Sequence, residues 1–368
     1  MRRPLRHSSK HSDKHGFFDG LPDDLVLFIL SKLSSTAPSP SHFITVLLTC
    51  KRLNQLALNR LVLSRAGEKI FAVKAKSWSE YAHRFLRRCV SAGNVHASYT
   101  LGMIQFYCLE NRESGFKLIA QAASRSHAPA LYSLAVIQFN GSGGSKSDKD
   151  LKAGVNLCAQ ASLLGHIDAL RELGHCLQDG YGTTQNIAEG RRLLIQANAR
   201  ELARVLRSVS IKSFPSRLRS SLMMWRVHRR LGNDACRIEW ICPLLSDYGY
   251  SVAVPEVHPA NRFLRDWYET GRGVLGEELR LCAHIGCGRP ETRPHEFRRC
   301  SVCGKVNYCS RGCQALDWKL RHKTECSPVE GWVVVNVDVG GGGADIGGNV
   351  NGGDDVVNDV VAQNVAAG

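Results

Sequence analysis

The sequence has little that would place the chain in a membrane or outside the cell. No stretch offers the roughly 18 consecutive apolar residues that a membrane-spanning helix needs, and residues 1–16 lack the apolar segment of a signal peptide. We therefore expect a soluble protein of the nucleus or the cytoplasm, or of both. Scattered thiols stay free in such a reducing compartment, so clustered cysteines indicate metal binding rather than disulfides.

Positively charged residues are absent from the C-terminal stretch. Residues 331–368 contain five Asp and no Lys or Arg, although the whole chain carries a formal net charge of +15. The basic balance invites a nucleic-acid interpretation, but the sequence shows no aromatic-studded basic groove and no recognisable DNA-binding helix. A solvated basic surface explains the charge better, and we expect neither nucleic acid nor a membrane as partner.

The remaining composition predicts a mainly α protein of several units, because 368 residues exceed the usual length of one domain. The two ends, one basic and one rich in Gly, Val and Asp, cannot bury a core and are expected to be disordered. The boundaries that we predict are 1–15 for a disordered basic tail, 16–66 for a helical cluster, 67–91 for a helical linker, 92–206 for helical repeats, 207–279 for a second helical linker or cap, 280–327 for a cysteine-rich finger and 328–368 for a disordered tail.

Seven of the fourteen cysteines lie in the finger, where they form four pairs of soft ligands with one histidine. The members of each pair are close enough in the chain for one tight turn to direct both at one ion, and zinc takes four ligands tetrahedrally. Two structural zinc ions therefore fit, and no coordination position is left for a catalytic water. The predicted ligands are Cys282, Cys287, Cys300, Cys303, Cys309, Cys313, His322 and Cys326.

This spacing resembles the MYND zinc finger, and the likeness is strengthened by Tyr308-Cys309-Ser310, Cys313-Gln314 and Asp317-Trp318 ahead of His322. The interval from Cys313 to His322 is one residue longer than the family pattern, which leaves the phase of the intervening helix open. The resemblance implies interleaved pairs, with one ion held by Cys282, Cys287, Cys309 and Cys313 and the other by Cys300, Cys303, His322 and Cys326.

The MYND resemblance also implies a peptide-binding surface. Protein-binding members of that family take a short proline-rich strand in a groove, and the positions that match its contact residues are Ser301, Gln314 and Trp318. Gln314 and Trp318 are four residues apart, which places them on one helix face. The alternative is that Trp318 only covers the zinc core.

Residues 92–206 repeat a helical pattern. Ala97, Ala130 and Ala169 are each followed four residues later by a leucine and then by a small residue, so that paired helices recur every 33 to 39 residues. A period of this length is typical of an α-solenoid, which binds proteins along a concave face. The starts at residues 165–169 and the turns at 179–182 resemble Sel-type repeats, relatives of tetratricopeptide repeats. The glycine-rich turn at 141–145 lacks the following Lys-Ser/Thr of a phosphate-binding loop.

The N-terminal cluster resembles an F-box. Leu21-Pro22-Asp23-Asp24-Leu25 predicts a helix that begins after Pro22 and ends near Leu33, and a second helical segment is expected from Phe43 to Leu58. The resemblance implies docking on the Skp adaptor of Skp–cullin–F-box ubiquitin ligases. The alternative is an ordinary helical hairpin whose leucines face its own core. The implied adaptor contacts are Leu21, Pro22, Leu25, Ile29 and Leu30.

A basic run between Arg207 and Arg237 separates the repeats from the finger. We interpret it as a capping helix with a solvated basic face, in preference to a site for an acidic partner. A short helix is expected from Asn261 to Tyr268, where it leads into the finger.

The order of these parts resembles plant F-box proteins with a C-terminal MYND finger. It implies a non-catalytic substrate receptor that recruits a target protein for ubiquitination, and the MYND resemblance offers a proline-rich peptide as one means of recruitment. Three alternatives remain: a transcriptional scaffold without a ligase, a MYND lysine methyltransferase, and a RING ligase. The methyltransferase would need a SET domain around and after the finger, and RING histidines lie in the middle of their pattern, whereas His322 is the seventh of eight ligands.

Overall fold

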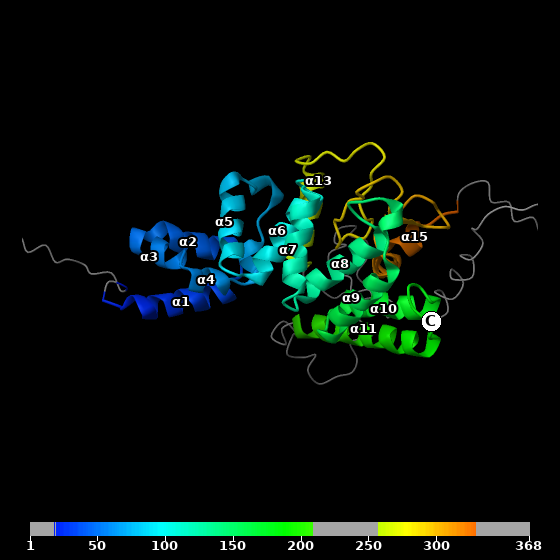
Figure 1. Cartoon of the computed structure of the whole chain (residues 1–368), viewed down its shortest axis with the longest axis horizontal. Coiled ribbons are helices and arrows are strands. Elements are labelled where there is room, and N and C mark those ends of the chain that lie inside the picture. The colour runs from blue at the N-terminus through cyan, green and yellow to red at the C-terminus, as the bar shows by residue number, and fades with distance from the viewer. Residues whose placement is uncertain (1–17, 19, 209–256, 329–368) are drawn as a thin grey trace, which may run out of the picture. The chain divides into compact units, whose positions relative to one another are not determined.

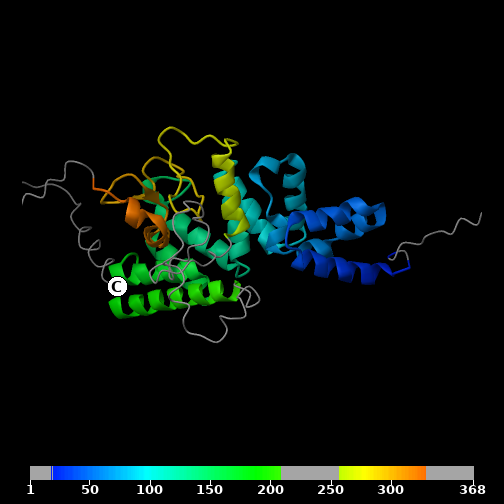
Figure 2. The same cartoon turned by 180° about the vertical axis from the view of Figure 1, so that it is seen from behind.

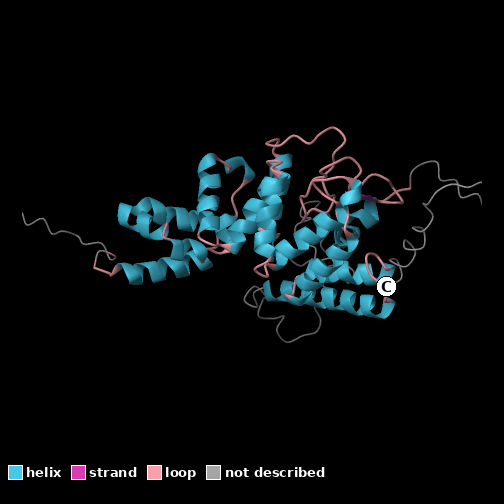
Figure 3. Cartoon of the chain, in the orientation of Figure 1, coloured by secondary structure: helices cyan, strands magenta, loops and turns pink. Residues whose placement is uncertain are grey.

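The computed structural model describes residues 18, 20–208 and 257–328. In this part of the chain helices dominate, and a two-stranded sheet is found in the finger (Figures 1 and 3), so the predicted mainly α class is confirmed. None of the described helices has the length and hydropathy required to cross a bilayer. The expected terminal tails and the basic run after Arg207 lie outside the described residues, apart from a few residues at their edges.

Four helices make the N-terminal cluster: α1 (Asp23–Thr36), α2 (Pro40–Thr49), α3 (Lys51–Ala57) and α4 (Arg60–Ser64). Arg52 holds the turn before α1, because its guanidinium donates to the backbone oxygens of Phe18 and Leu21 and to the Asp23 carboxylate at 2.5 to 3.0 Å. The turn at Leu21 and Pro22 is therefore fixed by α3 rather than by its own sequence alone.

The cluster differs from the expected pair of helices in two places. The helix that was expected to end near Leu33 continues to Thr36, because the Ser34 hydroxyl is buried and donates to the backbone oxygens of Ser31 and Val62. The single segment expected from Phe43 to Leu58 is divided between α2 and α3. Cys50 is the division, since its backbone is extended and its Sγ accepts the Leu53 N–H at 3.4 Å as the N-cap of α3.

Two short 3₁₀ helices, η1 (Glu68–Phe71) and η2 (Ala75–Ser77), and α5 (Glu80–Ser91) lead to three helix pairs. The pairs are α6 (Val95–Tyr107) with α7 (Arg112–Ala123), α8 (Ala128–Asn140) with α9 (Leu151–Leu163), and α10 (Ile167–Asp179) with α11 (Ile187–Ser208), with η3 (Lys146–Asp148) inside the second pair. Consecutive helices lie side by side in both views (Figures 1 and 2).

The repeating residues of the sequence form the interior of these pairs. Ala97, Ala130 and Ala169 are fully buried. A Cβ on Gly102 would lie 2.8 Å from the side chain of Ile119, so the small residue after each leucine permits close helix packing, as the pattern predicts. The unequal repeat lengths arise in the turns, where Gly141 and Gly180 adopt the left-handed conformation at the ends of α8 and α10.

The first helix of each pair is covered on a second side by the C-terminal part of the chain. Helix α13 (Pro259–Glu269), which includes the short helix expected from Asn261 to Tyr268, contacts α6, and α14 (Arg311–Asp317) contacts α10. The Tyr268 hydroxyl donates to the backbone oxygen of Tyr107, and the Asn261 amide donates to that of Cys287 at 2.9 Å. Helix α13 thus joins the repeats to the finger.

Three histidines and a tyrosine gather where α6, α8 and α13 meet. The Tyr99 ring lies 5.0 Å from the rings of both His127 and His258, and His127 Nε2 is 3.3 Å from His96 Nδ1. Burial, followed by the neighbouring histidines, lowers the pKa of His127 and of His258 from 6.5 to about 3. Both rings are therefore neutral in the folded protein near pH 7.

We expect acid to destabilise the fold through these histidines. Below pH 6.5 these histidines bind protons in the unfolded chain but stay neutral in the folded chain. The free energy of unfolding therefore falls as the pH falls from 6.5 toward 3, by about 1.4 kcal/mol per pH unit for each such group. Thermal melts of the zinc-loaded protein at pH 7 and pH 5 should show a smaller acid loss for His127→Gln, by up to about 2 kcal/mol.

The exposed His42 supplies the control, because its loss leaves this cluster intact. Acid also weakens zinc binding by protonating cysteines, so the informative quantity is the difference between variants at equal zinc. An acid sensitivity that is equal in wild type, His42→Gln and His127→Gln would contradict the prediction.

Candidate metal centres

Four cysteines meet in the first centre. Their sulfurs all lie within 4.8 Å of one another, and the separations are 3.4 Å between Cys287 and Cys309 and 3.6 Å between Cys309 and Cys313. Tetrahedral zinc with Zn–S bonds of about 2.3 Å needs sulfurs about 3.8 Å apart. All four side chains are buried, so this set of Cys282, Cys287, Cys309 and Cys313 fits a closed structural site.

The second centre has three sulfurs and one imidazole. His322 Nε2 lies 3.3 Å from Cys300 Sγ and 3.5 Å from Cys303 Sγ, and Cys300 Sγ lies 3.9 Å from Cys326 Sγ. These distances suit zinc bound by three thiolates and one ring nitrogen. The two sets of four are those that the MYND resemblance implies, and they confirm zinc, as two ions, as the cofactor.

The ligands are positioned by short elements of regular backbone. Strands β1 (Arg298–Arg299) and β2 (Asn307–Tyr308) pair antiparallel, and the Cys300 N–H donates to Val306 O at 3.0 Å, which closes the turn carrying Cys300 and Cys303. Helix α14 begins at its N-cap Ser310, whose hydroxyl accepts the Cys313 N–H at 3.1 Å. The ligands Cys309 and Cys313 therefore lie on either side of one helix start.

A π-helical turn accounts for the long interval between Cys313 and His322. After α14 the chain forms a π-helix, η8 (Trp318–His322), and then the short α15 (Lys323–Glu325). A π turn holds one more residue than an α turn and typically absorbs a single insertion. The extra residue is thus taken up before His322, whose imidazole still reaches Cys300 and Cys303.

The charge of the first centre is offset by a residue that the sequence did not single out. Arg289 is buried, and its guanidinium donates to Cys287 Sγ at 3.3 Å and to the Ser133 hydroxyl on α8 at 2.8 Å. It also lies over the Tyr132 ring at 5.8 Å. Four thiolates around one Zn²⁺ keep a net negative charge, and a buried charge needs a partner. Arg289 therefore links this centre to the repeats.

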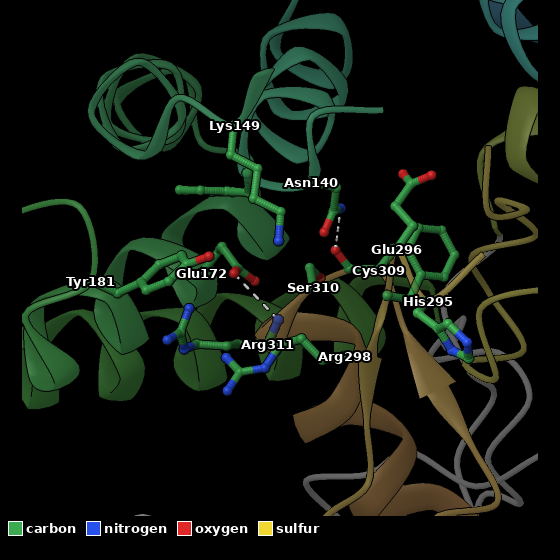
Figure 4. A pocket seen from close by; sticks show the side chains of 12 residues that line it. Asn140, Lys149, Glu172, Tyr181, His295, Glu296, Arg298, Cys309, Ser310 and Arg311 are labelled. Atoms are coloured by element: carbon green, nitrogen blue, oxygen red, sulfur yellow. Dashed lines mark hydrogen bonds between the residues drawn. The ribbon is translucent and has the colours of Figure 1, made fainter. Parts of the chain in front are cut away.

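Helix α10 contributes a carboxylate to the finger. Glu172 is buried and accepts the N–H groups of Arg311 and Gly312 at 3.3 and 2.6 Å, at the start of α14 (Figure 4). The Asn140 amide donates to Cys309 O at 2.8 Å. Repeat side chains thus satisfy backbone groups immediately beside two zinc ligands.

The glycine-rich turn after α8 is occupied by the finger. Arg293 donates to Gly141 O at 2.7 Å, and Gly143 N donates to the Thr292 hydroxyl at 2.7 Å. The Ser142 hydroxyl donates to the Glu296 carboxylate. The turn therefore serves as a contact within the chain, in agreement with the missing phosphate-loop pattern.

The proposed adaptor contacts are divided by burial. Pro22, Leu25 and Ile29 are exposed and Leu21 is half-buried, whereas Leu30 is 3% exposed and faces the core of the helical cluster. Leu30 therefore supports the fold in this structure instead of presenting a surface. Phe28 is 57% exposed beside Leu25 and Ile29, and the sequence interpretation had not assigned it a contact.

The proposed peptide contacts are all at least partly accessible. Ser301 is exposed, and Gln314 and Trp318 are half-buried. The Trp318 ring meets the His322 ring edge to face, with centroids 5.8 Å apart. Trp318 therefore covers a zinc ligand and still keeps accessible surface, which is compatible with both interpretations of this residue.

The comparisons with known proteins cover most of the chain. Residues 68–172 match the family model of plant tetratrico peptide repeats, and residues 282–326 match the MYND finger. An F-box protein of Arabidopsis thaliana is 63% identical over 335 residues, which are 91% of this chain and 86% of the relative. A second Arabidopsis F-box protein is 56% identical over 345 residues, covering 93% and 95% of the two chains. A solved Sel1 repeat protein from Oxalobacter formigenes aligns with 50% of this chain and 73% of its own at 17% identity and a TM-score of 0.36.

We expect Arg289→Met to accelerate zinc loss from the first centre, because the tetrathiolate site then loses its buried counter-charge. Mutation of a residue that supports a metal ligand typically lowers metal affinity by about 10- to 100-fold. Zinc release into a chromogenic chelator should therefore show one phase accelerated about tenfold or more, while the phase of the Cys300–Cys303–His322–Cys326 centre keeps its rate.

Two variants control this measurement. Arg289→Lys retains the charge but not the guanidinium fork, so its release rate should fall between those of wild type and Arg289→Met. Arg299→Met removes an exposed arginine that donates to Gly304 O, next to the second centre, and it should leave the first phase unchanged. Identical first-phase rates in wild type and Arg289→Met would show that Arg289 has no such role.

Proposed function

The chain belongs to the family of F-box proteins that carry plant tetratricopeptide-like repeats and a MYND finger, and from this premise we propose that it is a substrate-recognition subunit of a Skp–cullin–F-box ubiquitin ligase. Its N-terminal cluster binds the Skp adaptor, and the remainder recruits a target protein. No catalytic step is assigned to the chain, because both zinc centres are filled by protein ligands.

An apolar group of side chains on α1 supports adaptor binding. Leu25, Phe28 and Ile29 are exposed, and their i, i+3, i+4 spacing places them on one face of the helix. Exposed apolar side chains are normal singly, but a contiguous group of them is typical of a protein-binding site. The adaptor contacts that we now propose are Leu21, Pro22, Leu25, Phe28 and Ile29.

The covered face of the repeats limits where a target can bind. Helices α6, α8 and α10 are buried between their partner helices and the finger with α13, so a target reaches them only by displacing contacts within the chain. The accessible alternatives are the second helices of the pairs and the outer side of the finger around Ser301, Gln314 and Trp318. The predicted location in the nucleus or cytoplasm suits this role and remains a prediction.

We expect Leu25→Ala/Phe28→Ala to weaken adaptor binding by about tenfold or more, because each buried apolar side chain contributes roughly 1.5 to 3 kcal/mol. The measurement is calorimetric titration of the purified full chain with the purified Skp adaptor. Both side chains are exposed, so their loss leaves the core of the cluster in place.

Leu163→Ala is the matched control, since Leu163 is 88% exposed on α9, outside the N-terminal cluster. Its adaptor affinity should equal that of wild type. Equal, measurable affinity of the double variant and wild type would show that Leu25 and Phe28 are not adaptor contacts. Absence of adaptor binding by wild type itself would remove the ligase role and favour a scaffold that uses the finger without an adaptor.

We also expect Trp318→Ala to reduce binding of proline-rich peptides while the protein retains two zinc ions. The Trp318 ring contacts His322 but is not a ligand, so zinc content measured by mass spectrometry separates loss of the surface from loss of the metal site. Unchanged peptide or target binding with two zinc ions retained would place the recruiting surface elsewhere, most simply on the second helices of the repeats.

A further inference from the structure

A pocket lies where the finger meets the repeats. It has a volume of about 170 Å³, and its wall comes from α8, the turn before α9, α10, β1 and the start of α14 (Figure 4). Residues from both parts of the chain are needed to form it. The pocket therefore exists only while the finger is docked.

Three cationic side chains line this pocket. Lys149 approaches from the repeats, and Arg298 and Arg311 approach from the finger (Figure 4). Arg311 is already engaged, because it pairs with Asp179 at 2.8 Å and lies 3.8 Å above the Tyr181 ring. Lys149 and Arg298 make no side-chain hydrogen bond or ion pair with any residue in the described ranges.

The two carboxylates in the pocket wall, Glu172 and Glu296, accept hydrogen bonds from donors other than Lys149 and Arg298. Glu172 accepts the N–H groups of Arg311 and Gly312. Glu296 accepts the Thr292 N–H and hydroxyl, each at 2.6 Å, and the Ser142 hydroxyl. Both side chains are buried, so these acids hold the docked finger and are poorly placed to pair with Lys149 and Arg298.

The electrostatic field at Lys149 is unfavourable for its positive charge. Partial burial, followed by the neighbouring cations Arg293 and Lys146, lowers the pKa of Lys149, and Glu296 opposes this shift. An anion bound in the pocket would relieve the repulsion between Lys149 and these cations.

We propose that this pocket binds a phosphate group carried on a protein partner. Two unpaired cations match the charge of a phosphate monoester, about −1.5 to −2 at pH 7, better than that of one carboxylate. Arginine and lysine together offer the fork and the point charge that phosphate oxygens accept. That the partner is a ligase target rests on the proposed function, whereas phosphate binding itself does not require the adaptor.

The test uses the zinc-loaded full chain and inorganic phosphate as the probe. Phosphate should raise the melting temperature above that in chloride of equal ionic strength. The increase should grow with phosphate concentration, as expected for a ligand that binds the folded state. Lys149→Ala/Arg298→Ala should abolish the increase. Lys152→Ala/Lys305→Ala removes the same charge from exposed positions outside the pocket and should retain it.

Equal phosphate effects in all three proteins would reduce the observation to general charge screening and overturn the proposal. Loss of the effect counts only if the double variant keeps two zinc ions and its helical circular dichroism. The single variants Lys149→Ala and Arg298→Ala, each expected to weaken the response, keep the test decisive if the double variant does not fold.

Two further arms identify the source of the anion. O-phosphoserine should compete with phosphate for the pocket, and glutamate should compete at least tenfold more weakly. Equal competition by glutamate would overturn the assignment to phosphate. A variant that combines Asp338→Asn, Asp345→Asn, Asp354→Asn, Asp355→Asn and Asp359→Asn should leave phosphate affinity unchanged. A tenfold gain in affinity would assign the pocket to the chain's own acidic tail.

The outcome is independent of the adaptor experiment. Phosphate binding is measured without the adaptor, and Leu25 and Phe28 lie outside the pocket. Loss of adaptor binding with phosphate binding retained would remove the ligase role and leave the site. The reverse result would remove the site and leave the ligase role.

Discussion

The contact between Arg289 and the Cys287 thiolate is the interaction on which much of this structure depends. A tetrathiolate zinc centre keeps negative charge, and its burial against α8 is tolerable only if a cation is buried with it. Arg289 is that cation, and it also donates to Ser133 and lies over Tyr132. The same arginine therefore balances the charge of the zinc centre and holds the finger against the repeats.

In this protein the inner helices of the repeats contact the finger, a role that differs from the usual one of binding a partner. Solenoids commonly present a face of inner helices to their partners. Here α6, α8 and α10 are in contact with α13 and the finger, and polar groups such as Glu172 and Asn140 satisfy finger backbone atoms. The finger completes the repeats, and new surfaces, including the pocket with Lys149 and Arg298, arise at their junction.

Local chemistry made part of this structure predictable. The ligand sets could be predicted because zinc needs soft donors in closely spaced pairs, and the helix pairs because Ala97, Ala130 and Ala169 recur with a period. The division at Cys50 was missed because a cysteine Sγ caps α3 there, where Ser, Thr, Asp or Asn would have been the recognisable N-cap. The π turn at Trp318 was missed because the length of an interval does not show how a helix absorbs the extra residue. Arg289 and Glu172 were missed because one lies between ligands and one within a repeat, and only the fold brings them to the zinc centre.

Helix α1 of the N-terminal cluster has two apolar sides, one buried and one exposed. Val26 and Leu30 on α1 face the core together with Phe43 and Val62. Leu25, Phe28 and Ile29 project elsewhere and contribute little to that core. Arg52 fixes the turn before them, so this second apolar side is held in place before anything binds. A surface ordered in advance loses less conformational entropy on association, which favours its role as a docking site over that of a packing remnant.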